Sequence, residues 1–200
     1  MKIKTTFAML ACALGLQSGL AAAEGTIAAE PLQTIAALDV PRYMGTWYEI
    51  AKYPNWFQRK CVGDTRAEYG LQPSGQIQVI NRCREEDGGL SEAVGQARQI
   101  GPADSPRLEV RFAPAWLSFL PMVWGDYWVI DLDPDYQLVA VSEPSREYLW
   151  VLSRTPAVDA QAYERLLGRL QARGFEPARL ERTPQSDAAT DAEPVGGATQ

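Results

Sequence analysis

The sequence predicts an all-β fold: an eight-stranded antiparallel up-and-down β-barrel with one C-terminal α-helix packed outside it. Eight short segments rich in aromatic and β-branched residues follow one another from Gly45 onward, separated by turn-forming stretches. After Ser153 the apolar residues change from an alternating to a helical spacing. Closing the strands into a barrel also removes the edges that an open sheet would expose.

Residues 1–23 have the character of a secretory signal peptide rather than of folded structure. Two lysines near the start precede an uncharged, largely apolar stretch, and Ala21–Ala23 supplies the small residues that a signal peptidase reads. Cleavage is expected between Ala23 and Glu24. Lipoprotein processing at Cys12 is an alternative, although the apolar run before that cysteine is short. The protein is therefore expected to be exported to the periplasm, with an association with the outer membrane left open.

The folded region is expected over residues 39–182. Residues 24–38 before it are Ala-rich and unpatterned, which indicates a flexible leader. Residues 183–200 after it bury too little apolar surface to stay ordered, which indicates a disordered tail. The expected strands cover residues 46–53, 62–69, 76–83, 91–100, 108–112, 127–132, 136–141 and 148–153.

The helix is expected to begin after Asp159, a residue type that favours the N-cap. Apolar residues recur at helical spacing from Ala160 to Leu170, and Gly174 suits the position just past the helix. Residues 175–180 are expected to form a short last strand.

Removal of the signal peptide leaves two cysteines, Cys61 and Cys83. An even pair in an exported protein indicates a disulfide. A hairpin in which the second and third strands pair with Cys61 directly opposite Cys83 puts both on one face. Two separate buried thiols are the alternative.

Composition excludes several classes of function. Lys and Arg number 19 against 25 Asp and Glu, and no basic run exists to neutralise phosphates, so nucleic-acid binding is not expected. The chain has 0 His, which removes Ser–His and Cys–His nucleophile pairs and every His metal site. No cofactor and no metal are expected.

Three segments resemble, in order, the signatures of the lipocalin family. Gly45 and Trp47 match the G-x-W motif at the start of the first strand, Asp133 and Tyr136 loosely match the second motif, and Arg154 matches the arginine that ends the last strand. The resemblance extends over about residues 39–182 and is nearest to bacterial lipocalins of the outer-membrane lipoprotein type, which are related to apolipoprotein D. It implies a barrel that binds a hydrophobic ligand.

Up-and-down connectivity brings all three signatures to one end of the barrel. Trp47 is therefore expected to fill the base, with the Arg154 guanidinium lying over its indole ring. This role is structural rather than ligand-binding.

Period-two alternation selects the residues that face into the barrel. In the fourth strand these are Ala93, Gly95 and Ala97, whose small side chains leave room for a ligand. Arg98 and Lys60 are candidates to meet a charged lipid headgroup. A solid core is the alternative to a cavity. Related lipocalins place aromatic residues matching Tyr69 and Trp150 against the ligand, and the full set of expected ligand-binding residues is Ala67, Tyr69, Val79, Leu108, Val110, Phe112, Tyr127 and Trp150.

The loop over residues 113–124 is largely apolar and carries no charge. Connectivity places it at the open end, where Trp116 and Phe119 join Trp56 and Phe57 of the first loop as expected mouth or membrane contacts. A lid that folds over the mouth is the alternative.

The leading functional hypothesis is non-catalytic binding and transport of a fatty acid, lysophospholipid or similar lipid in the bacterial cell envelope. One alternative is an interaction protein that docks a membrane or a partner through the apolar 113–124 loop. Another is a lipid-modifying enzyme, which the missing histidines and paired cysteines disfavour. The sequence leaves the oligomeric state undetermined.

Overall fold

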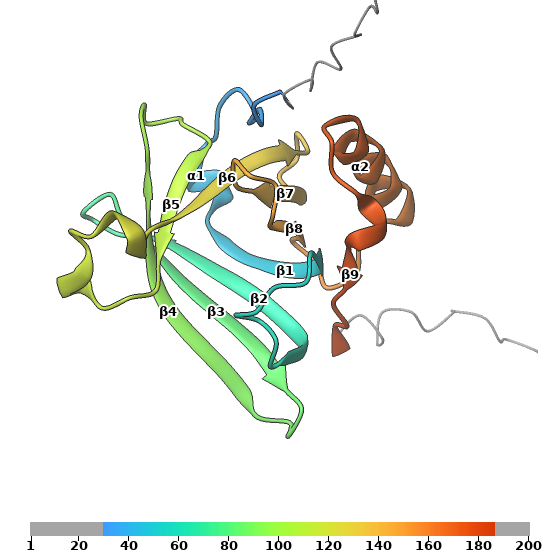
Figure 1. The fold of residues 1–200 in the computed structure, drawn as a ribbon, viewed down its shortest axis with the longest axis horizontal. Helices are drawn as coiled ribbons and strands as arrows, with labels where there is room; N and C mark the ends of the chain where they lie inside the picture. The colour runs from blue at the N-terminus through green and yellow to red at the C-terminus, as the bar shows by residue number, and fades with distance from the viewer. Residues whose placement is uncertain (1–29, 187–200) are drawn as a thin grey trace, which may run out of the picture. The chain divides into compact units, whose positions relative to one another are not determined.

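The computed structural model describes residues 30–186 and confirms the predicted barrel (Figure 1). The sheet order runs from β2 through β8 to β1, and β1 also pairs with β2, which closes the ring; every pairing is antiparallel. The predicted signal peptide lies outside the described residues. The barrel strands are β1 (Gly45–Lys52), β2 (Cys61–Leu71), β3 (Ile77–Glu85), β4 (Leu90–Gln99), β5 (Arg107–Arg111), β6 (Gly125–Leu132), β7 (Leu138–Ser142) and β8 (Leu149–Ser153).

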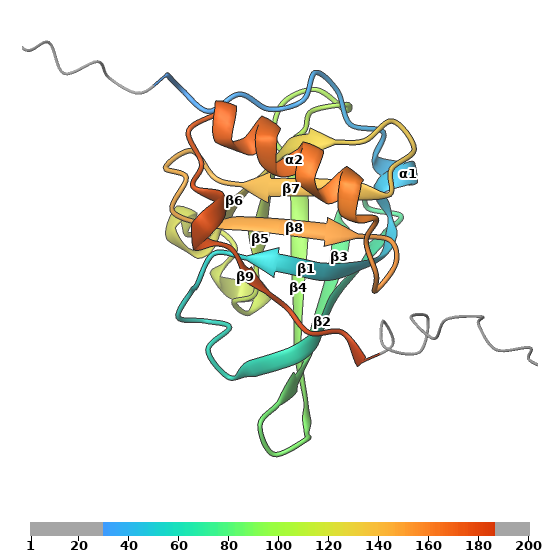
Figure 2. The same cartoon turned by 90° about the vertical axis from the view of Figure 1, so that its right-hand side faces the viewer.

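One side of the barrel is covered by the helix α2 (Ala160–Ala172), which crosses the outer face of β7 and β8 (Figure 2). The Asp159 side chain caps its first turn by accepting from the Ala162 amide at 2.7 Å, as expected. Because α2 covers the outer face and the barrel interior covers the other, every residue of β7 is buried. No helix within residues 30–186 combines the length and apolarity needed to cross a membrane.

The end of the barrel where β1 begins is closed partly by Leu38, a residue that the sequence assigned to a leader. The short helix α1 (Val40–Tyr43) packs there, and Leu32 and Leu38 are 3% and 1% exposed. The prediction of a flexible leader is therefore wrong over residues 31–38. The reason is that Leu38 fills the barrel interior while Leu32 joins the core under α2, so two leucines anchor a segment whose other residues are half-buried or exposed.

The disulfide between Cys61 and Cys83 is present, with a Cα–Cα distance of 5.5 Å, but the predicted register is wrong. Two irregularities near the start of β2 place Cys61 opposite Glu85, and further along Tyr69 lies opposite Val79. Asp64, at the second irregularity, has a positive φ of 52°. The bulged strand therefore brings the sulfur atoms together although the two residues are not cross-strand partners.

Residues 181–186 complete the barrel wall beside β1 and correct two predictions. Residues 177–179 form a 3₁₀ turn instead of a strand, and the short β9 (Glu181–Arg182) follows and pairs with β1. The expected tail is wrong over residues 183–186, because their polar groups are held by hydrogen bonds: the Thr183 amide donates to the Ile50 carbonyl at 3.0 Å and the Asp64 amide donates to the Pro184 carbonyl at 2.8 Å. These residues fill the seam that opens where β1 diverges from β2.

Candidate ligand-binding cavity

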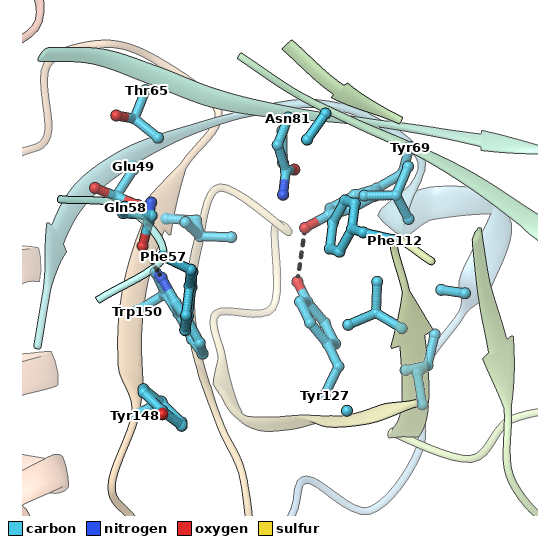
Figure 3. Close-up of a pocket in the computed structure, with 18 of the residues that line it drawn as sticks. Glu49, Phe57, Gln58, Thr65, Tyr69, Asn81, Phe112, Tyr127, Tyr148 and Trp150 are labelled. Carbon is cyan, nitrogen blue, oxygen red and sulfur yellow. Dashed lines mark hydrogen bonds between the residues drawn. The ribbon is translucent and has the colours of Figure 1, made fainter. Parts of the chain in front are cut away.

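The barrel encloses a cavity of about 880 Å³ that opens at the end opposite Trp47. All eight residues expected to bind the ligand line it, and so do Trp56 and Phe57 at the rim, whereas Trp116 and Phe119 do not. A solid core is therefore excluded for this part of the barrel. Whether these side chains contact a ligand stays a prediction. Figure 3 shows how the larger lining side chains converge on the cavity from opposite walls.

The small-residue face of β4 contributes in two different ways. Ala93 and Ala97 line the open volume, as expected. At Gly95 the room is taken by Phe112, because a Cβ built on this glycine would lie 2.7 Å from the Phe112 ring and 2.6 Å from the Arg111 carbonyl oxygen. Because Gly95 has no side chain, the Phe112 ring, which directly follows β5, can pack against the backbone of β4.

The base of the barrel is the expected indole–guanidinium pair. Trp47 is 0% exposed, and the Arg154 guanidinium carbon lies 4.0 Å from the centroid of its ring. Arg154 also donates to the carbonyl oxygens of Thr46, Arg42 and Tyr136 at 3.0, 2.7 and 3.2 Å. Gly45 also lies beside Arg154, since a Cβ built on it would be 3.3 Å from the guanidinium. Four signature residues thus meet in one closed end, and the fifth, Asp133, accepts from the amides of the turn that carries Tyr136.

Above Trp47, three tyrosine hydroxyls form a hydrogen-bonded chain at the floor of the cavity. The Tyr127 hydroxyl lies 2.7 Å from that of Tyr43 and 3.0 Å from that of Tyr69. Burial is the main cause that raises the pKa of all three phenols, that of Tyr69 to about 12. The three groups are therefore neutral hydroxyls at physiological pH.

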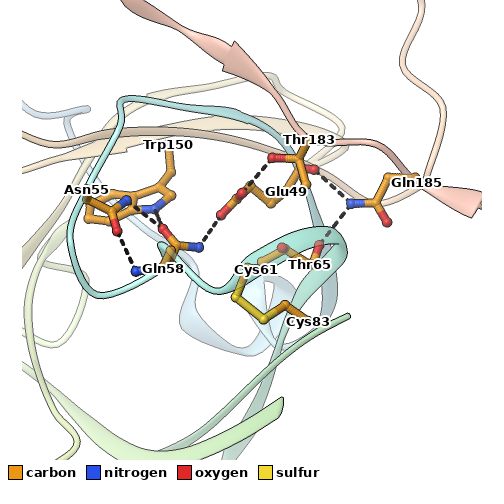
Figure 4. Close-up of a disulfide and its surroundings, with 9 residues drawn as sticks. All are labelled: Glu49, Asn55, Gln58, Cys61, Thr65, Cys83, Trp150, Thr183 and Gln185. Carbon is orange, nitrogen blue, oxygen red and sulfur yellow. Dashed lines mark hydrogen bonds between the residues drawn. A yellow bond between two sulfur atoms is a disulfide. The ribbon is translucent and has the colours of Figure 1, made fainter. Parts of the chain in front are cut away.

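A second polar network ties the first loop to the cavity wall (Figure 4). The Gln58 amide nitrogen donates to the Glu49 carboxyl at 2.6 Å, while the Gln58 oxygen accepts from the Trp150 indole at 3.0 Å and from Asn55 at 2.7 Å. The Thr183 hydroxyl donates to the other Glu49 oxygen at 2.6 Å. The network fixes the orientation of the Trp150 ring and anchors the loop that carries the rim aromatics.

Glu49 is the buried ionisable group of this wall, at 3% exposure. Burial raises the pKa of its carboxyl, and the hydrogen bonds from Thr183 and Gln58 oppose this shift. Next to it, the Thr65 hydroxyl oxygen is buried without a hydrogen-bond partner in the described part of the chain. The wall below the rim is therefore polar, although the cavity is mostly apolar.

The loop over residues 113–124 forms one side of the rim and does not cover the mouth with its tip. Val123 and Trp124 line the cavity, but Trp116, Phe119 and Met122 are 73%, 74% and 85% exposed. The Trp124 ring lies 4.1 Å from the Arg98 guanidinium carbon, and its indole N–H donates to the Ser118 carbonyl at 2.8 Å, which anchors the returning end of the loop. The lid interpretation therefore does not hold for the tip, which presents apolar side chains to solvent.

The expected headgroup cations do not lie at the cavity. Arg98 pairs with Glu109 at 2.7 Å on the outer face and stacks 4.1 Å from the Trp124 ring, and Lys60 is exposed and does not line the cavity. Strand alternation turns Arg98 outward, which explains its position. Within residues 30–186 no group of three or more Cys, Asp or Glu side chains is arranged to hold a metal ion.

Sequence reasoning missed most of the polar lining. Glu49 shares the parity of Trp47 in β1, so alternation could have found it. Tyr43 and Gln58 lie outside the strands, and no periodic signal marks them. Asn81 follows Val79 at the inward spacing of β3, and its side chain points into the cavity (Figure 3).

A family model described as a lipocalin-like domain matches residues 38–185. Temperature-induced lipocalin-1 of Arabidopsis thaliana is 42% identical over 158 residues, which cover 78% of this chain and 84% of the relative. Outer membrane lipoprotein Blc of Escherichia coli strain K12 is 35% identical over 143 residues, covering 71% of this chain and 76% of the relative. The bacterial resemblance is thus confirmed, but the plant relative is more similar in sequence.

Among solved structures, insecticyanin from the tobacco hornworm Manduca sexta has the same fold, with a TM-score of 0.61 at 18% identity, covering 79% of this chain and 86% of that chain. Lipocalins are known for binding small hydrophobic ligands and are generally non-catalytic. The match to the family model spans the barrel, the helix and residues 181–185 of the seam. This chain belongs to the lipocalin family.

Proposed function

We propose that this protein binds a fatty acid, a lysophospholipid or a similar lipid in the barrel and carries it without catalysing a reaction on it. The observation that carries the proposal is the cavity of about 880 Å³, lined by apolar and aromatic side chains and open at one end. Small-molecule sites commonly have volumes of roughly 300–1,000 Å³ and this kind of lining.

The expected affinity follows from the apolar surface that a lipid chain buries. Each methylene contributes about 0.8 kcal/mol, so a chain of about sixteen carbons gains on the order of 10 kcal/mol before the costs of association. Lost motion and ordering remove part of that gain, which leaves binding that is roughly micromolar. The cavity therefore suits a reversible carrier.

We further propose that the protein works in the bacterial cell envelope after export. The signal-like N-terminus supports this setting, as does similarity to a relative named an outer membrane lipoprotein. The Cys61–Cys83 disulfide also suits an oxidising compartment. Cell fractionation with an antibody to the mature protein tests it, and recovery in the cytoplasm would contradict it.

A cavity-filling substitution tests the carrier function. Ala97 is 5% exposed and faces the cavity, so Ala97→Phe should weaken binding of a fluorescent polyene fatty acid about tenfold or more. Val94 lies on the same strand and is 53% exposed, which makes Val94→Phe the matched control, with unchanged binding. Equal binding by both variants and the wild type would show that the ligand does not enter the barrel.

Two further measurements separate a carrier from the alternatives. Native mass spectrometry of the purified protein should detect a bound lipid, and its class identifies the cargo. Thiol titration of the folded protein should find Cys61 and Cys83 unreactive, because they are paired. A free, alkylatable thiol would instead favour an enzyme.

The exposed tip of the 113–124 loop supports a second proposal, contact with a membrane surface during lipid uptake. Trp116, Phe119 and Met122 form an uncharged patch, and Trp56 extends the apolar rim at 72% exposure. Exposed apolar patches of this kind mark interaction surfaces. Insertion of the patch into a bilayer would bring the mouth of the cavity to the lipid.

The double variant Trp116→Ser with Phe119→Ser should weaken association with liposomes without changing the melting temperature. Leu71→Ser is the control, because Leu71 is 50% exposed at the end of β2, on the opposite end of the barrel. Unchanged vesicle binding by the double variant would refute membrane contact and leave docking of a partner protein as the role of the loop.

A further inference from the structure

The floor of the cavity carries a hydrogen-bonding group that an apolar ligand chain does not need. Three tyrosines from three separate elements meet there: Tyr43 from α1, Tyr69 from β2 and Tyr127 from β6. Their rings are in contact, with centroids 5.7 Å apart for Tyr43 and Tyr69 and 6.1 Å apart for Tyr69 and Tyr127. In Figure 3 the hydroxyls of Tyr69 and Tyr127 meet inside the cavity.

Counting protons shows that this cluster has one donor left over. Each hydroxyl has one proton to donate, and Tyr127 joins the other two through two hydrogen bonds. Two bonds use two of the three protons, whichever way each bond points. In the described part of the chain the three hydroxyls bond only to one another, so one O–H donor is left without an acceptor in a cluster whose three members all line the cavity.

The charges around the floor determine which ligand atom this donor fits. The lining cations, Arg66 and Arg82, both pair with Glu68. Arg154 lies beneath the Trp47 ring, where its N–H groups donate to backbone carbonyls. An anionic oxygen at the floor would therefore be desolvated with no unpaired cation in contact, since Arg154 acts on the floor only from behind the Trp47 ring, whereas a neutral oxygen needs only the one donor.

We propose that the Tyr43–Tyr127–Tyr69 cluster is a subsite for a neutral oxygen, a hydroxyl or a carbonyl, at the buried end of the lipid. The proposal rests on the proposed function, because it requires a ligand inside the barrel. It narrows the cargo to amphiphiles that carry an uncharged oxygen far from their charged head, with the charged head at the mouth. The pKa of all three phenols is raised, so the subsite keeps its proton at any physiological pH.

The test compares unbranched fatty acids, from decanoic to octadecanoic acid, with their ω-hydroxy counterparts. In the wild type an ω-hydroxyl that stops short of the floor should weaken binding about tenfold, because it is buried without a partner. At the chain length that reaches the tyrosines, this loss should disappear. The ω-hydroxy acid of that length should bind at least as tightly as the plain acid.

The triple variant Tyr43→Phe, Tyr69→Phe and Tyr127→Phe removes the whole cluster at once. It leaves no hydroxyl buried without a partner, so the fold should tolerate it better than a partial deletion. The variant should bind plain acids as the wild type does and should show the tenfold loss for ω-hydroxy acids at every length.

The outcomes separate this proposal from the function on which it rests. If no plain fatty acid binds the wild type, the carrier function fails. If plain acids bind but the wild type shows the same loss for the ω-hydroxyl at every chain length, the subsite is refuted, and this result does not depend on whether the triple variant folds. Equal discrimination by the wild type and a folded triple variant would also refute it.

Discussion

Removing the disulfide should destabilise the barrel by an amount that follows from the chain it closes. Cys61 and Cys83 are separated by 22 positions. Constraining a loop of that size in the unfolded state stabilises the folded state by about 3 kcal/mol in the chain-entropy treatment. The substitutions should disturb the fold as little as possible. Cys61→Ser suits the half-buried position, and Cys83→Ala avoids burying a hydroxyl where Cys83 is 4% exposed.

Urea unfolding followed by tryptophan fluorescence measures the effect. The double variant should lose about 3 kcal/mol of unfolding free energy, which lowers the midpoint by roughly 1–3 M for slopes usual in proteins of this size. Wild-type protein unfolded in a strong reductant is the matched control and should coincide with the double variant. Adding the reductant to the double variant should cause no further change, because the disulfide is already absent.

A loss below about 1 kcal/mol would refute the reasoning, because the loop constraint would then be offset elsewhere. Agreement between the reduced wild type and the double variant matters equally. If they differ, the substitutions themselves have disturbed the bulged start of β2, and the difference measures that disturbance.

Two other substitutions test the polar contacts. Burial raises the pKa of the Glu49 carboxyl above its ordinary value of 4.5, so the folded state favours the protonated form and the stability contributed by this group falls as the pH rises from 4.5 through the folded-state pKa. Glu49→Gln should remove that fall. Parallel profiles of melting temperature against pH for the wild type and the variant would contradict this prediction. Arg154→Lys keeps the charge but loses the planar guanidinium that donates to the carbonyls of Thr46, Arg42 and Tyr136. The variant should lose roughly 3 kcal/mol of unfolding free energy, measured by urea unfolding. A loss near zero would argue against a stabilising role for these three hydrogen bonds.

The strands and the apolar lining could be predicted because each depends on local pattern. Alternation in β5 identifies Leu108 and Val110 as inward-facing whatever the rest of the chain does. The same rule places Tyr127 and Trp150 in the cavity once the strand limits are known. The closed base of the barrel could also be predicted, because up-and-down connectivity alone brings Trp47 and Arg154 to one end.

The features that sequence reasoning missed depend on contacts between distant residues. The bulge around Asp64 shifts the β2–β3 register, and Gly63 beside it is only a weak local sign of a bulge. Thr183 belongs to a polar segment that is ordered only because Glu49 and Ile50 accept its hydrogen bonds. Leu38 is one of two leucines in an Ala-rich stretch, and only the closed end of the barrel explains its burial. Patterns within one segment carry no information about such partners.

The seam has a consequence for the order of events during synthesis. β1 emerges from the ribosome early, yet part of its edge is completed by residues 181–186, which are made more than a hundred residues later. A nascent chain that still lacks these residues has a barrel wall with unpaired backbone groups beside Ile50 and Ala51. Completion of the seam is therefore a late, long-range step, and a chain stopped before residue 181 would leave this part of the β1 edge free to pair with other chains.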